Sequence, residues 1–168
     1  ASPTPPHLRR NFNALVVDVT LFALGIAFLD HATVLPVIVR ELGGGETALG
    51  AILALRQAAL YLPPLLSGHH LQGRLRLMPH LRKVALLGRL SLLPAARALW
   101  LWGARQPGLA LVVFAAAYLV SWAGDGAGMV PWAAVIGRAI PANRRGRLFA
   151  TIQALSSVVR LGAGLVVT

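Results

Sequence analysis

The stretch GLALVVFAAAYLVSWAGDGAGMVPWAAVIG, residues 108–137, decides which class of fold this chain adopts. It contains one charged residue, Asp125, among glycines, alanines and large apolar side chains. In a soluble protein, an Asp-Gly pair suggests a tight turn. Here the apolar flanks reach the length of about 20 residues that a helix needs to cross a bilayer. The role of Asp125 therefore depends on whether water or lipid surrounds this segment.

Composition favours lipid. The 168 residues are 57% hydrophobic and 12% charged, with a mean hydropathy of +0.68, whereas soluble domains carry about 25% charged residues. A net charge of +11 could indicate a nucleic-acid-binding protein. The basic residues, however, come in short groups between long apolar runs, which is typical of membrane proteins. We therefore expect the chain to interact with the lipid bilayer and not with nucleic acid.

Five apolar runs are long enough to cross a membrane, and they predict an all-α, polytopic bundle of about five transmembrane helices. They cover about 14–39, 49–67, 84–102, 109–137 and 148–168, so residues 13–168 form the membrane domain and residues 1–12 a cytoplasmic segment. The last run reaches Thr168 without a polar cap. From this we expect the chain to be an incomplete, N-terminal portion of a longer protein.

The basic loops predict the orientation of the helices. Ten basic residues fall before the first run, after the second and after the fourth, while the alternate loops hold only Arg40 and Arg105. Because cytoplasmic loops are enriched in Lys and Arg, the N-terminus is expected in the cytoplasm and the chain in the inner (plasma) membrane. The ten are Arg9, Arg10, Arg74, Arg76, Arg82, Lys83, Arg138, Arg144, Arg145 and Arg147.

Several motifs resemble the N-terminal half of bacterial major facilitator superfamily transporters. The first run carries RRNF, Asp18, Phe22, Gly25 and TVLPVIVREL. The segments LGGGETALG, LPPLLS, LRKVALLGRL and WAGDGAGMVPWAAVIGRAIPANRRGRLFA follow in the order found in that family. The most specific is the last, with a proline and then RRGRLF after a fourth helix. In the second basic loop Gln72 occupies the usual acidic position, so the superfamily's charge lock is in question here.

The resemblance implies two six-helix halves that alternate access to a central site, with helices one and four beside the cavity. It also implies a role for two loops at the cytoplasmic gate, which here contain Gly68, Arg74, Arg76, Arg144, Arg145, Gly146 and Arg147. The partners would be the missing C-terminal half or a second membrane subunit, and a small solute that moves alone or together with protons.

Ionisable residues inside the runs are the candidates for a substrate or proton pathway, because charges within a membrane are costly and usually functional or paired. The candidates are Asp18, Asp30, His31, Arg56, Asp125 and Arg160, with Trp122 as an aromatic wall. Matched depths suggest pairs of Asp30 with Arg56, Asp18 with Arg89 and Asp125 with Arg160. Asp125 has two interpretations, a structural ion pair that fixes helix packing, or a site for protons or substrate. Gly124 and Gly128 would let a neighbouring helix approach closely.

Asp30 and His31 are either a proton relay or an interfacial polar patch.

No catalytic set is expected, since Ser, His and Asp lie at unrelated depths. The glycine run 43–45 lacks the Lys-Ser/Thr of a phosphate-binding loop. Without cysteine, thiolate metal sites and disulfides are excluded, and we expect neither a metal nor a cofactor. Two functions remain open, part of a secondary transporter for a small solute, and a non-transporting scaffold or assembly module that packs against partner membrane proteins.

Overall fold

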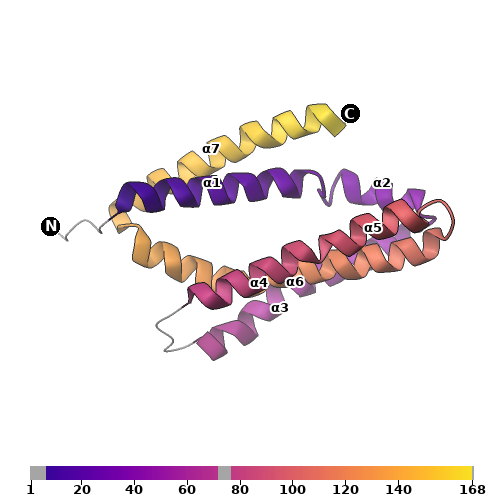
Figure 1. The fold of residues 1–168 in the computed structure, drawn as a ribbon, viewed down its shortest axis with the longest axis horizontal. Coiled ribbons are helices and arrows are strands. Elements are labelled where there is room, and N and C mark those ends of the chain that lie inside the picture. Colours follow the sequence, from indigo (N-terminus) through magenta and orange to yellow (C-terminus); the bar gives the residue numbers. More distant parts are fainter. Residues whose placement is uncertain (1–6, 72–76, 168) are drawn as a thin grey trace. The chain divides into compact units, whose positions relative to one another are not determined.

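The computed structural model describes residues 7–71 and 77–167, and the regular structure within them consists of helices alone. The helices are α1 (Leu8–Ala27), α2 (Val34–Glu41), α3 (Glu46–Leu71), α4 (Met78–Leu90), α5 (Leu92–Trp102), α6 (Pro107–Ala139) and α7 (Ala142–Val167) (Figure 1). The all-helical class predicted from the sequence is therefore confirmed.

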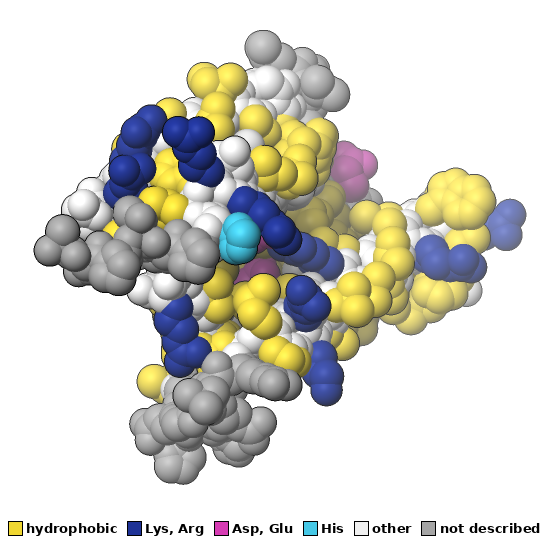
Figure 2. All heavy atoms as spheres, turned by 60° about the vertical axis from the view of Figure 1, so that its left-hand side comes forward, with side chains coloured by type: hydrophobic (Ala, Val, Ile, Leu, Met, Phe, Trp, Pro, Cys, Tyr) yellow, Lys and Arg dark blue, Asp and Glu magenta, His cyan; other side chains and the backbone are white. Residues whose placement is uncertain are grey.

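Four helical segments are long and apolar enough to cross a membrane, namely Leu8–Ala27, Glu46–Leu66, Met78–Trp102 and Pro107–Ala139. Large apolar side chains such as Leu65, Leu87 and Trp100 are exposed on these segments. In Figure 2, apolar surface alternates with small groups of Lys and Arg side chains. Such a surface suits contact with lipid tails and is compatible with a multi-pass membrane protein.

The fifth predicted span coincides with a helix, α7, but α7 is not among these four segments. Its first turns hold Arg144, Arg145 and Arg147, and Gln153 and Arg160 follow further along. These polar residues lower the hydropathy of α7, which explains why only its helical state is confirmed.

The first predicted span, 14–39, is divided into two helices. The carboxylate of Asp30 accepts hydrogen bonds at Oδ1 from the backbone N–H of Ala32 (2.9 Å) and Thr33 (3.0 Å) and from the Thr33 hydroxyl (3.1 Å). Such local bonds compete with the helical pattern. They form the turn between α1, which ends at Ala27, and α2, which begins at Val34.

The third predicted span, 84–102, also consists of two helices, joined at Ser91. The Ser91 hydroxyl donates to the carbonyl oxygens of Gly88 (2.6 Å) and Ala117 (3.0 Å). Pro94 lies in the first turn of α5, where a missing N–H costs no helical bond.

The chain forms two compact units, one made of residues 1–34 and 136–168 and the other of Leu35–Val135. In the first unit, of which the structure describes 7–34 and 136–167, α1 packs along α7 (Figure 1). Val16 and Ala23 of α1 are buried, as are Leu148, Ile152 and Ala163 of α7. Their spacings of four, seven and eleven residues, close to whole helical turns, place each set on one helix face.

The second unit is organised around α6. Small residues form a seam on α6 at alternating spacings of three and four: Ala117, Ser121, Gly124 and Gly128. Gly124 meets the backbone of Val84 and Gly88 of α4, because a Cβ built on Gly124 would lie 2.9 Å from the Val84 carbonyl oxygen. The close approach expected at Gly124 is confirmed, and it is the small-residue packing that membrane helices use.

The turn between α2 and α3 follows a regular helix-ending pattern. Gly43 has φ +77°, its N–H donates to Arg40 O (2.9 Å), and the N–H of Gly44 donates to Val39 O (2.8 Å). These two bonds form a Schellman motif, in which glycine adopts the left-handed conformation without strain. The Arg40 guanidinium then pairs with Glu46 at the start of α3 (2.8 Å), which keeps this loop short.

Candidate functional site

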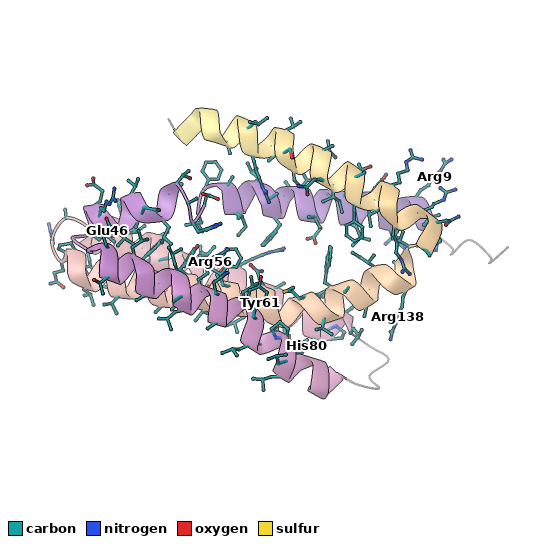
Figure 3. All side chains as sticks on the ribbon, turned by 180° about the vertical axis from the view of Figure 1, so that it is seen from behind. Arg9, Glu46, Arg56, Tyr61, His80 and Arg138 are labelled. Atoms are coloured by element: carbon teal, nitrogen blue, oxygen red, sulfur yellow. The ribbon has the colours of Figure 1, made fainter. Side chains whose placement is uncertain are left out.

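Arg56 of α3 is the most deeply buried charge that the structure describes, with an exposed fraction of 9%. Its guanidinium carbon lies 3.8 Å from the centroid of the Trp122 ring of α6, a cation–π contact. Its Nη1 donates a hydrogen bond to Oε1 of Gln57 (3.0 Å). Figure 3 shows Arg56 on α3, with Glu46 at the start of the same helix and Tyr61 further along it.

Trp122 ends a row of aromatic rings on α6. Phe114 and Tyr118 stack with centroids 5.9 Å apart, and Tyr118 meets Trp122 edge to face at 6.1 Å. The spacing of four residues places the three rings on one face of the helix. Phe114 and Tyr118 are each only 1% exposed. The row is therefore a rigid support that holds the Trp122 ring against Arg56.

Asp125 lies one helical turn beyond Trp122, half-buried on α6. Its neighbours bring two helices close: Gly124 faces α4, and Gly126 faces the backbone of Ala59 and Leu60 of α3. A Cβ on Gly126 would overlap the Leu60 carbonyl oxygen. Asp125 is thus held where α6 passes closest to both neighbours.

Arg89 of α4 acts electrostatically on the Asp125 carboxylate. Arg89 follows Gly88, the residue that seats α4 against Gly124, so the close approach of α4 to α6 brings this cation towards Asp125. The sequence paired Asp125 with Arg160 and Asp18 with Arg89. Each of these pairs joins the two units, and both stay predictions.

Asp30 and His31 lie together in the turn between α1 and α2, with His31 Nδ1 3.9 Å from Asp30 Oδ2. Both side chains are partly exposed, at 48% for His31 and 36% for Asp30. The Oδ1 of Asp30 accepts three hydrogen bonds inside its own turn, so Asp30 stabilises the turn that leads into α2. The predicted pair of Asp30 with Arg56 joins the two units and stays a prediction.

Asp18 is an exposed residue of α1. The residues predicted at the cytoplasmic gate lie in two segments, one at the end of α3 and the other at the start of α7. Gly68 lies within α3, while Arg74 and Arg76 lie outside the described residues. Arg144, Gly146 and Arg147 are exposed in the first turn and a half of α7.

Arg145, between them, has a specific structural role. Its Nε donates to the Ile140 carbonyl oxygen (3.0 Å) and its Nη2 to that of Gly137 (2.8 Å). The last carbonyls of a helix have no partners within it, and a cation is favoured at this negative end of the helix dipole. Arg145 thus caps α6 from the start of α7 and fixes the turn between the two helices.

The sequence prediction omitted Gly88, Gly126, Gln57 and the two rings Phe114 and Tyr118. A signal for some of them is present: Gly88, Ser91, Ala95 and Ala98 repeat at spacings of three and four, matching the seam on α6. Neither the Gln57 hydrogen bond nor the direction of the Arg56 side chain has a comparable signal in the sequence.

The arrangement can hold one anionic and one cationic group inside a helical bundle, at Arg56 and Asp125 respectively.

Comparison of the chain with protein-family models, with curated proteins and with solved structures finds no match.

Proposed function

We propose that the chain is part of a secondary transporter that moves a small solute across the membrane by alternating access. The observation that carries the proposal is Arg56, a buried cation in the middle of a span. Glu46–Leu66 has 21 residues, and Arg56 is the eleventh. A charge at the bilayer centre costs at least about 2.5 kcal/mol on insertion scales, so such residues are rare and mark substrate or ion pathways.

Two further features support a transport function over a scaffold. Asp125 adds a second ionisable group on α6, the helix that also supplies Trp122. The first apolar run is interrupted at residues 28–33, and interrupted helices contribute to substrate sites in many transporters. A scaffold needs neither buried charges nor a broken span, since apolar and small residues suffice for helix packing.

In this proposal the chain supplies one wall of the solute pathway, in the manner of the N-terminal half of a major facilitator superfamily transporter. A second set of helices, from the remainder of the protein or from another subunit, supplies the other wall. The N-terminus and the basic loops face the cytoplasm, and the chain resides in the inner (plasma) membrane.

Because the chain has no cysteine, single cysteines can test the proposal by labelling. In intact cells, a membrane-impermeant maleimide should label Arg105→Cys without lysis and Arg147→Cys only after lysis. Gln57→Cys, beside Arg56, should react through a water-filled pathway, whereas Leu65→Cys on the apolar surface of α3 should react slowly. Gln57→Cys that reacts no faster than Leu65→Cys would contradict a solute pathway at Arg56 and favour the scaffold.

Uptake into proteoliposomes is the second test. The chain alone should show no saturable uptake, because one wall of the pathway is missing. Saturable uptake by the isolated chain as a monomer would show that this single wall suffices and would refute the division into two walls.

A further inference from the structure

The hydrogen-bonding capacity of Arg56 is only partly used by the protein. A guanidinium carries five N–H donors in a fixed plane. Nη1 donates to Gln57, and one face of the plane lies on the Trp122 ring. Nε is buried and has no hydrogen-bond partner among the described residues. Nε is thus a donor that the described residues leave unsatisfied, and it lies on the Nε–Nη2 edge, the edge that binds both oxygens of a carboxylate side by side.

The charge of Arg56 is likewise not balanced within its unit. Leu35–Val135 contains three acidic residues, Glu41, Glu46 and Asp125. Glu46 pairs with Arg40, Asp125 is under the influence of Arg89, and Glu41 is exposed at the end of α2. No carboxylate within this described unit forms an ion pair with Arg56. A buried cation that lacks a counter-ion in its own unit is stabilised by an anion from outside that unit.

The depth of Arg56 restricts the source of that anion. Ten residues of helix at about 1.5 Å each place Arg56 about 15 Å from the start of the span, close to the bilayer midplane. Lipid headgroups lie at the surface of a hydrocarbon core about 30 Å thick. A headgroup phosphate therefore does not reach Arg56, and a solute inside the bundle does.

We propose that Arg56, held by Gln57 and Trp122, binds the carboxylate of a small organic acid, so that the solutes of this protein are carboxylates. One guanidinium edge matches one carboxylate. Trp122 presses on one face of the guanidinium and directs its Nε–Nη2 edge. The inference rests on the proposed transport function, because a scaffold has no need of a bound acid.

Binding to the complete 168-residue chain in detergent tests this inference independently of transport. With Trp100, Trp102 and Trp132 replaced by Phe, Trp122 is the sole tryptophan, and its fluorescence reports on the Arg56 contact. The probes are butyrate, the neutral butyramide and inorganic phosphate, at constant ionic strength in sodium chloride. Butyrate should change the fluorescence saturably, and butyramide should not.

The variants separate the charge from the shape of the side chain. Arg56→Gln should weaken butyrate binding by about tenfold or more, the size expected for a charged hydrogen bond of 1.5–3 kcal/mol. Arg56→Lys, which keeps the charge but not the fork, should fall between that variant and the original chain, and its binding shows that the fold survives. Arg97→Gln is the matched control, because Arg97 is an exposed arginine of α5, and it should bind as the original chain does.

Three outcomes would overturn the inference. Equal responses to butyrate and butyramide, or unchanged binding by Arg56→Gln, would show that the carboxylate is not recognised. Phosphate binding tighter than butyrate would assign the site to phosphate groups. A tenfold gain in butyrate affinity in Asp30→Asn would identify Asp30 as the resident counter-ion of Arg56. Butyrate binding without saturable uptake by any assembly would instead refute only the transport proposal.

Discussion

Gly124→Ala should destabilise the chain, although alanine is the better helix former. A Cβ at residue 124 would lie 2.9 Å from the Val84 carbonyl oxygen and 3.0 Å from the Gly88 Cα, and both of these are backbone atoms. Ordinary contacts of a Cβ begin at 3.4 Å, so α4 and α6 must separate by about 0.5 Å or bend. Neither neighbour can rotate away, in contrast to the end of a flexible side chain.

The magnitude follows from two opposing effects. Overpacking of a close contact costs about 1–3 kcal/mol, and replacing Gly by Ala in a helix gains about 1 kcal/mol. Gly50→Ala in α3 is the matched control, since nothing lies within 4 Å of the Cβ that it adds. The difference in unfolding free energy between the two variants isolates the overpacking and should be about 1–3 kcal/mol. For a chain of this length that corresponds to a gap of about 2–12 °C in Tm.

Thermal unfolding in detergent micelles, followed by circular dichroism, measures the gap. Gly124→Ala should unfold below the original chain or close to it, and Gly50→Ala at or above it. If Gly124→Ala unfolds at the same temperature as Gly50→Ala or higher, α4 and α6 do not meet at Gly88 and Gly124, and the position assigned to Asp125 is refuted with them.

Three further predictions concern local hydrogen bonds. Asp30→Ala should raise amide exchange at Ala32 and Thr33 by about fivefold to thirtyfold, since loss of a capping carboxylate costs about 1–2 kcal/mol, and unchanged exchange would contradict its role in the turn. Arg145→Gln should raise amide exchange around the end of α6, by about fivefold for a partly exposed bond of about 1 kcal/mol; equal exchange in Arg145→Gln and in the exposed control Arg144→Gln would refute the cap. Ser91→Ala should lower Tm by about 1–3 °C, because hydrogen bonds between membrane helices average about 0.6 kcal/mol, and a rise in Tm would show that the bond to Ala117 contributes nothing.

The sequence was sufficient for the helical class because hydropathy is a property of whole segments. Helix locations followed within a few residues for the second and fourth spans, where apolar runs end at charged or glycine-rich loops. The break at residues 28–33 was not predicted, because the long apolar stretches on both sides of Asp30 and His31 let residues 14–39 fit one apolar run. Only the geometry shows that Asp30 turns back onto its own backbone.

The candidate site was less predictable than the fold. Depth along each helix located the charges within the apolar runs but could not provide the rotation of one helix against another, so Asp18 and Arg160 were chosen although both are exposed. The sequence did not predict that Arg89 acts on Asp125 or that Arg56 contacts Trp122. Both contacts follow from glycines on α6, because Gly124 lets α4 approach and Gly126 lets α3 approach.

The seam also explains why two opposite charges can coexist on adjoining helices without neutralising each other. Arg56 is directed to the ring of Trp122, and Asp125 is three residues further along α6, where Gly124 brings Arg89 of α4 near. Three residues turn a helix by about 300°, so Trp122 and Asp125 diverge by about 60° and face different neighbours. Arg56 consequently keeps a buried Nε without a hydrogen-bond partner among the described residues, whereas a carboxylate at residue 122 itself would neutralise the cation. The tryptophan holds the cation in place without neutralising its charge.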